Sequence, residues 1–314
     1  MSNNWSVPET EVVQRARERI AGGSGSDVLA TIVDVEGNAY RRPGAKMLLD
    51  AEGGGLGAIT AGCLEDELVK AAGSVREHGQ PELVTYDLME DDEAVWGLGV
   101  GCNGIIDVLL EPLDETYAPA VEAFDSGRDI AVLTVIEGND ALAQGDRAYV
   151  HPADGRLDPA TERGSDGKDH GTWPDALVGP ATKLARSGKA DLVTVETASG
   201  PLSVFIDGMA APTELVVFGT GHDVGPVTEL AAKNDFRVTV VGFRGGVDLS
   251  ERFPAADRTV TTSPRDVGTD LDLSDRSYAV VMTHNFLDDQ LTVEALLEEA
   301  RQLRAVAERM EEGV

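Results

Sequence analysis

Residues 215–225 read Leu-Val-Val-Phe-Gly-Thr-Gly-His-Asp-Val-Gly, a short apolar run followed at once by a glycine-rich turn. The pattern after the turn favours a helix, and a second apolar run occupies residues 237–241. Strand, glycine turn, helix and strand in this order make a β-α-β unit, whose two strands are parallel. Apolar runs at residues 259–260 and 278–282 extend this sheet. The sequence therefore predicts a Rossmann-like parallel-sheet domain over residues 212–314.

The pattern of residues 1–211 predicts a mixed α+β domain. Together with the parallel-sheet domain that follows, this assigns the whole chain to the α/β class. Apolar stripes at helical spacing that end at glycines predict helices at residues 6–22 and 64–78, and residues 115–124 are also predicted as a helix. Alternating or wholly apolar runs predict strands at 28–35, 46–49, 82–86, 105–110 and 129–136, and another helix with two short strands between 174 and 206. Residues 151–172 are rich in glycine and proline, which predicts an exposed loop. No internal repeat is visible.

The chain is strongly acidic. Its 314 residues include 26 Lys and Arg against 56 Asp and Glu, which gives a formal charge of −30. Such a surface repels the phosphates of nucleic acids and anionic lipids, so neither nucleic acid nor a membrane is expected as a partner. The carboxylates are spread along the chain, and we interpret them as a halophile-type surface.

Two further absences bear on location and redox state. No charged and apolar leader pattern occurs at the N-terminus, and no apolar run approaches the roughly 18 residues needed to span a bilayer. A cytoplasmic protein is therefore expected. The sequence has two cysteines, Cys63 and Cys102, which implies no disulfide framework.

The turn after residue 218 resembles the start of a dinucleotide fingerprint. Gly219 makes the tight turn, Gly221 lets a pyrophosphate approach backbone N–H groups, and the third glycine, Gly225, is displaced by one position. The next strand ends on Gly242, where an acid would bind the ribose hydroxyls, and Arg244 nearby could accept a 2′-phosphate. The loop either binds a phosphate-bearing ligand, NADP being the favoured nicotinamide cofactor, or merely forms the turn.

Two histidines follow strands of the same sheet. His222 comes directly after the second glycine, and His284 follows the apolar run that ends near residue 282. Both imidazoles are therefore expected at the sheet edge where open α/β sheets bind ligands. Each is either a ligand contact or a structural hydrogen-bonding residue.

Both cysteines occur in glycine-rich segments. Cys63 follows Gly62 just before a predicted helix, and Cys102 lies within residues 99–104. Glycine loops allow a ligand close to the backbone, and thiolates are soft ligands for metal or sulfur chemistry. The alternative for each is a small buried apolar side chain. Because no Cys-x-x-Cys or His-Glu-x-x-His pattern occurs, no metal site is predicted, and no catalytic residue is assigned.

A series of motifs runs in order along nearly the whole chain. In the first half they are Arg42-Pro43-Gly44-Ala45-Lys46-Met47, Gly62-Cys63-Leu64-Glu65, Gly97 to Gly104 and Val108-Leu109-Leu110-Glu111-Pro112. In the second half they are Val217 to His222, Glu251 to Asp257 and Val281-Met282-Thr283-His284. Taken together, these segments resemble the xanthine dehydrogenase accessory factor family, written XdhC/CoxI.

The resemblance implies a maturation factor, rather than an enzyme, for molybdenum hydroxylases of the xanthine and carbon monoxide dehydrogenase type. Members bind the molybdenum cofactor (molybdopterin), protect it while a cysteine desulfurase installs a sulfido ligand, and pass it to the apo molybdenum hydroxylase. A homodimer is compatible with this likeness. The residues predicted to bind the cofactor lie in these motifs, except for the last two, which come from the glycine turn and the strand end after it. They are Arg42, Lys46, Gly62, Cys63, Glu65, Gly101, Cys102, Gly104, Gly219, Gly221, His222, His284, Gly225 and Arg244.

Two other functions stay open at this point. One is an NAD(P)-dependent oxidoreductase that uses the Gly219–Gly225 loop, with His222 or His284 as proton donor. The other is a scaffold that docks a desulfurase and a client enzyme without holding cofactor. Family members also continue past the Thr-His motif with further strands, where this sequence has a charged helical segment. A shortened parallel sheet is therefore expected.

Overall fold

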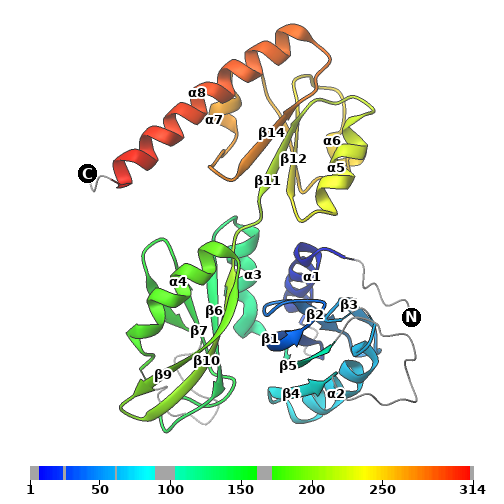
Figure 1. The fold of residues 1–314 in the computed structure, drawn as a ribbon. Coiled ribbons are helices and arrows are strands. Elements are labelled where there is room, and N and C mark those ends of the chain that lie inside the picture. The colour runs from blue at the N-terminus through cyan, green and yellow to red at the C-terminus, as the bar shows by residue number, and fades with distance from the viewer. Residues whose placement is uncertain (1–6, 24–25, 61, 89–102, 161–171, 312–314) are drawn as a thin grey trace. The chain divides into compact units, whose positions relative to one another are not determined.

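The computed structural model describes residues 7–23, 26–60, 62–88, 103–160 and 172–311. The chain divides into two compact units (Figure 1). Unit 1 comprises Met1–Ala211 and unit 2 comprises Pro212–Val314.

Unit 1 opens with an amphipathic helix and a five-stranded sheet. Helix α1 (Glu9–Gly22) buries Val12, Val13 and Ala16 and ends at Gly23, which adopts the left-handed conformation. The elements after it are β1 (Val28–Asn38), β2 (Lys46–Leu49), β3 (Gly55–Gly57), α2 (Glu65–His78), β4 (Glu82–Asp87) and β5 (Asn103–Pro112). They form an antiparallel sheet of order β3-β2-β1-β5-β4.

A second helix and sheet follow. The 3-10 turn η1 (Glu115–Tyr117) leads directly into α3 (Ala118–Asp125). The elements after it are β6 (Ile130–Glu137), β7 (Arg147–His151), β8 (Arg156–Pro159), η2 (Asp175–Leu177), α4 (Val178–Ser187), β9 (Ala190–Thr197) and β10 (Gly200–Met209). They form an antiparallel sheet of order β8-β7-β6-β10-β9.

Unit 1 therefore contains an internal repeat. Residues 9–112, the first repeat, and residues 118–209, the second repeat, both run helix, three strands, helix, two strands, with the same strand order. The sequence-based expectation of no repeat was wrong. Sheet positions accept many apolar residues, so a topology can recur without a visible recurrence of sequence.

The turn that leads into the second strand matches closely between the repeats. Gly44 and Gly145 both adopt the left-handed region, with φ of 96° and 86°. The Gly44 N–H donates to the Ile32 carbonyl at 2.8 Å, and the Gly145 N–H donates to the Val135 carbonyl at 2.9 Å. The two chain segments thus make the same backbone turn, and each places a charged residue at the start of the next strand.

Helices α2 and α4 each cover one face of a sheet (Figure 1). The core under α2 includes Ile32, Leu68, Ala72 and Val108, and the core under α4 includes Leu133, Ala181, Ala185 and Ile206. The opposite faces share a third core with α1 and α3, which includes Val13, Leu29, Val121, Val132 and Tyr149. The two repeats are therefore joined by one apolar layer.

Unit 2 is a parallel sheet with helices on both faces. Its elements are β11 (Glu214–Phe218), α5 (Val224–Ala232), β12 (Arg237–Gly242), α6 (Leu249–Arg252), β13 (Arg258–Thr261), α7 (Val267–Asp270), β14 (Ser277–Val281) and α8 (Phe286–Glu311). The strand order is β13-β12-β11-β14, and all pairings are parallel. This confirms the predicted α/β class and the Rossmann-like unit.

The residues of β11 alternate between the two faces of this sheet. Val217 packs with Val224 on the side of α5 and α6, whereas Val216 and Phe218 pack with Val267 on the side of α7 and α8 (Figure 1). Because both faces are covered there, the central strands β11 and β12 are largely apolar and buried, as expected for a parallel sheet.

The structure differs from the sequence-based prediction in one glycine-rich segment: residues 151–172, predicted mostly as an exposed loop, contain β8. The glycine-rich stretch before α2 contains a similar short strand, β3. Both strands are short edge strands held by pairing with their neighbours β2 and β7. Glycines and prolines lower strand propensity, so the local sequence does not reveal strands that depend on a tertiary partner.

Candidate functional site

The exposed thiol of Cys63 lies in the loop between β3 and α2. Gly62, directly before it, has a φ of 105°, which favours glycine. The backbone N–H groups of Cys63 and Leu64 both donate to Thr60 Oγ1, at 3.0 and 3.1 Å. The Thr60 hydroxyl thus fixes the backbone of Cys63 and Leu64, which precede α2, while Cys63 itself is exposed.

A buried carboxylate supports this loop. Glu65 has no exposed surface, and its Oε1 accepts from the Thr60 N–H at 2.8 Å. Its Oε2 accepts from Thr60 Oγ1 at 2.6 Å and from the Leu64 N–H at 3.1 Å. A carboxylate is tolerated in a protein interior when donors satisfy it in this way. Glu65, predicted as a cofactor contact, therefore holds the Cys63 loop in shape.

We expect Glu65→Ala to lower the free energy of unfolding by about 2–3 kcal/mol, because the N–H and the hydroxyl of Thr60 lose the buried acceptor to which they donate. It should also raise the alkylation rate of Cys63 by iodoacetamide, because the loop loses the contacts that hold it in shape. The rate is measured in a Cys102→Ser background. The matched control is Glu67→Gln, an exposed residue of the same helical turn. Equal alkylation rates in both variants would contradict this role for Glu65.

The loop that carries Cys63 leaves the first sheet at a defined end. Asn103, the first residue of β5, pairs with Asn38, the last residue of β1. The end of β3, Gly57, pairs with Met47 near the start of β2, which points toward the same end of the sheet. The Cys63 loop and the connection from β4 to β5 are therefore anchored at one end of the first sheet.

The glycine-rich motif before β5 is only partly described. Gly101 and Cys102, both predicted cofactor contacts, lie outside the described residues. Gly104 lies in β5, where a Cβ atom would come within 2.5 Å of the Glu36 carbonyl oxygen. This glycine is therefore required for the close pairing of β1 with β5, which is a structural reason for its presence.

The two predicted cations of the Arg-Pro-Gly-Ala-Lys motif have different surroundings. Lys46 is buried; its Nζ lies 2.7 Å from Asp207 Oδ2 and donates to the Gly44 carbonyl at 2.8 Å. Burial alone would lower the pKa of Lys46, but the charge of Asp207 raises it well above its usual range. The charge of Lys46 is thus compensated inside the protein, whereas Arg42 is exposed.

A second buried ion pair mirrors the first. Lys46 opens β2 of the first repeat and pairs with Asp207 on β10 of the second. Arg147 opens β7 of the second repeat and pairs with Glu111 on β5 of the first. Burial raises the pKa of Glu111, against the opposing charge of Arg147. Each repeat therefore gives its cation to the acid of the other, as in an isologous two-fold interface.

In unit 2, the glycine loop lies at the switch point of the sheet. The order β13-β12-β11-β14 puts the first and last strands of the unit side by side, so their carboxyl ends frame the crevice where such sheets bind ligands. Gly219 has a φ of 150°, and a Cβ atom there would come within 2.5 Å of the Met282 carbonyl oxygen. The structure thus brings together the loop after β11 and the His284 segment after β14.

A hydrogen-bonded pair spans this crevice. His284 Nε2 lies 2.7 Å from Asp223 Oδ2, and His284 adopts a φ of 58°, which is uncommon outside glycine. The hydrogen bond from His284 lowers the pKa of Asp223. His222 is exposed beside them, and Gly225 lies in the first turn of α5. Asp223 was missed from the sequence, because only the fold reveals that it meets His284.

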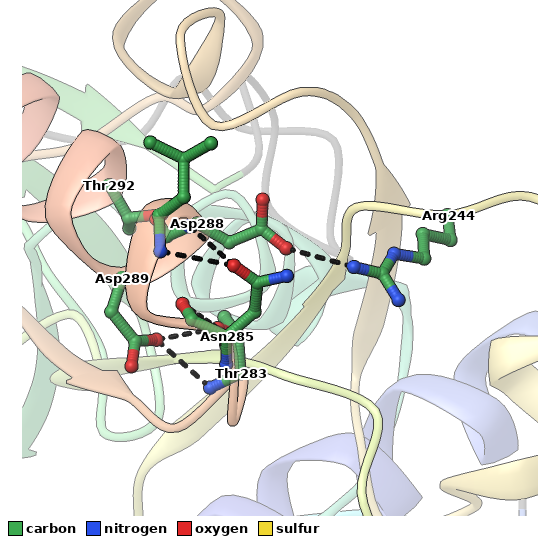
Figure 2. Close-up of polar contacts among 7 residues, drawn as sticks. Arg244, Thr283, Asn285, Asp288, Asp289 and Thr292 are labelled. Atoms are coloured by element: carbon green, nitrogen blue, oxygen red, sulfur yellow. Dashed lines mark hydrogen bonds and ion pairs between the residues drawn. The ribbon is translucent and has the colours of Figure 1, made fainter.

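Arg244 meets a carboxylate at the same edge. Its Nη2 lies 3.3 Å from Asp288 Oδ2. Figure 2 shows the two side chains pointing toward one another. Asp288 belongs to the first turn of α8, which Asn285 caps by accepting from the Leu287 and Asp288 N–H groups. The guanidinium predicted to bind a 2′-phosphate is thus already turned toward an acid.

The described ranges hold neither a metal-binding cluster nor a membrane-spanning helix. In them, no group of three or more His, Cys, Asp or Glu side chains could hold a metal ion. Within the same part of the chain, no helix has the length and apolar character that crossing a membrane requires.

Comparison with known proteins links both units to one family. Residues 25–87 match the XdhC and CoxI family, and residues 215–310 match the XdhC Rossmann domain. A protein of Bacillus subtilis (strain 168), named as a probable subunit of xanthine dehydrogenase, is 31% identical over 278 residues, covering 86% of this chain and 75% of that protein. A crystal structure described as a xanthine dehydrogenase from Bacillus halodurans is 25% identical with a TM-score of 0.65, covering 92% of this chain and 79% of that one. The chain therefore belongs to the XdhC and CoxI family.

Proposed function

We propose that this protein is a maturation factor for xanthine dehydrogenase-type molybdenum hydroxylases. In this proposal it binds the molybdenum cofactor, keeps it bound while a cysteine desulfurase supplies the sulfido ligand, and passes it to the apo-enzyme. The protein itself is not an enzyme in this scheme, and it works in the cytoplasm. The observation that carries the proposal is family membership in both units, together with the exposed Cys63 thiol on a supported loop.

The residues around Cys63 fit such a cofactor chemically. A thiolate is a soft ligand suited to molybdenum or to sulfur transfer. The exposed Arg42 offers a cation for a phosphate group. Lys46 is not included, because Asp207 already compensates its charge. When bound, the cofactor supplies the metal centre and its sulfido ligand, while the chain orients and shields it.

Cys102 is included in the proposed cofactor site because of its position in the sequence. It lies between β4 and β5, whose ends are anchored at the same end of the first sheet as the Cys63 loop. We propose that both thiols serve one cofactor. A homodimer and a complex with the desulfurase are proposed as partners on the family likeness.

The test is co-expression with a source of molybdenum cofactor, followed by purification in high salt to screen the net charge. Molybdenum and oxidised-pterin fluorescence are then measured in the wild type, Cys63→Ser, Cys102→Ser and the control Glu67→Gln. We expect wild type and control to retain both signals and the cysteine variants to lose at least about 90% of them, because a hydroxyl is a poor substitute for a thiolate ligand. Full retention in both cysteine variants would contradict the proposal.

The same preparation separates the two alternative functions. Nicotinamide absorbance without pterin would favour an NADP-dependent oxidoreductase. A protein without either ligand that still binds the desulfurase and the apo-enzyme would favour a scaffold.

A further inference from the structure

We infer that Asp223 determines the ligand specificity of the crevice in unit 2, by keeping phosphate-bearing ligands away from the glycine loop. The crevice has the topology of a dinucleotide site, with Gly219 and Gly221 in the expected places. The side chains around the glycine loop, however, disfavour the binding of a pyrophosphate. The inference does not rest on the cofactor proposed for unit 1.

The carboxylate of Asp223 fills the space that a pyrophosphate would use. In dinucleotide sites the second glycine has no side chain, so that the pyrophosphate can approach the backbone. Here a Cβ atom on Gly221 would lie 2.3 Å from Asp223 Oδ1. The oxygen thus occupies the room that the missing side chain leaves, and it is buried with no hydrogen-bond partner in the described ranges. An anion entering there meets a negative charge at close range.

Asp223 is not explained as a helix cap. It precedes the first residue of α5, where an aspartate commonly accepts hydrogen bonds from the next N–H groups, yet its side chain makes no such bond in the described part of the chain. Its Oδ2 accepts from His284 instead. A neutral replacement should therefore leave the helix stable.

The N-terminus of α5 also lacks parts that bind phosphate. The third glycine of the fingerprint is replaced by Val224, which is fully buried. The third residue of the helix is Pro226, which has no N–H group to offer an anion. The helix therefore presents fewer donors than a dinucleotide-binding helix does.

The end of β12, where a dinucleotide site binds the adenosine ribose, also differs from such a site. Gly242 ends β12 at the position of the ribose-binding acid, and a Cβ atom there would lie 3.1 Å from both Leu249 Cδ1 and Thr220 Cγ2. Apolar atoms already surround the place where a ribose-binding carboxylate would begin. Arg244, the cation nearest this strand end in sequence, lies against Asp288 (Figure 2). These contacts agree with the exclusion of NADP.

The test is isothermal titration of the purified full chain with inorganic pyrophosphate and, separately, with NADP, at one fixed ionic strength. The variants are wild type, Asp223→Asn and Asp223→Ser. The matched control is Asp275→Asn, which removes the same charge from an exposed position just before β14, where that strand begins. Circular dichroism checks that each variant is folded.

We expect wild type and Asp275→Asn to show no binding of either probe below millimolar concentration. Asp223→Asn and Asp223→Ser should bind pyrophosphate at least tenfold more tightly than wild type. Micromolar binding of NADP or pyrophosphate by the wild type would overturn the inference. It would also be overturned if neither Asp223 variant bound pyrophosphate more tightly than Asp275→Asn does.

Discussion

Replacing Asp207 with alanine is expected to lower the free energy of unfolding of unit 1 by about 3–5 kcal/mol. The substitution leaves Lys46 buried without its carboxylate, while the Gly44 carbonyl still accepts a hydrogen bond from it. An uncompensated charge in a protein interior is far more costly than the loss of the attraction itself. The measurement is urea denaturation of wild type and variant in the same salt.

A double variant distinguishes the destabilisation caused by an unpaired buried charge from the stabilisation that the ion pair itself contributes. Lys46→Met with Asp207→Leu removes both charges and replaces them with apolar groups of similar size. We expect its stability to lie within about 1 kcal/mol of wild type, since buried ion pairs are commonly replaceable in this way. If the double variant were as unstable as Asp207→Ala, the pair itself would be the main contribution and the argument would be wrong.

The pH dependence of this pair follows from the raised pKa of Lys46. A lysine whose pKa is higher in the folded than in the unfolded chain contributes stability that is complete below the unfolded value, about 10.4. That contribution is lost as the pH rises through the folded value. The free energies of unfolding of wild type and the double variant are compared as a function of pH. The contribution of Lys46 to their difference should be constant between about pH 6 and 9 and should shrink only in strong alkali.

The sequence predicts correctly those elements in which the spacing of apolar residues and the residues at both ends indicate the same structure. Helix α2 has an apolar stripe, acids in its first turn and Gly79 in the left-handed conformation at its end, and it lies where it was expected. The parallel sheet of unit 2 followed in the same way from short apolar runs and the Gly219 turn. In these segments the local pattern and the tertiary environment favour the same structure.

The contacts that depend on the repeat could not be predicted. Lys46 looks like a ligand-binding cation in sequence, because its partner Asp207 lies far away on the last strand of the second repeat. The one available signal was that both Lys46 and Arg147 follow a glycine turn at the start of a buried strand. Two such positions in equivalent turns would have indicated a duplicated arrangement.

The two repeats differ in the length of the connection between their last two strands. In the second repeat a turn at Ala198 and Ser199 joins β9 to β10. In the first repeat residues 88–102, which include Cys102, join the equivalent strands β4 and β5. The first repeat thus carries both cysteines, although both repeats supply core residues and a buried acid for the other's cation. A scaffold of two similar copies leaves the loops of one copy free to specialise.

Replacing Gly208 with alanine is expected to cost at least about 3 kcal/mol of the stability of unit 1, because the added methyl group has no room. Gly208 lies in β10 beneath α4, and a Cβ atom there would come within 2.2 Å of the backbone carbon and oxygen of Leu184. Backbone atoms cannot rotate away as a side chain can, so α4 would have to move off the sheet. The measurement is urea denaturation followed by circular dichroism.

The matched control is Gly73→Ala in α2, where nothing lies within 4 Å of the added Cβ atom. Alanine forms helix better than glycine, so this variant should gain about 0.5–1 kcal/mol. The two substitutions add the same methyl group, yet they are expected to change stability in opposite directions. A Gly208→Ala variant as stable as wild type would mean that α4 does not pack against β10 as closely as the structure places it, and the core of the second repeat would need a different description.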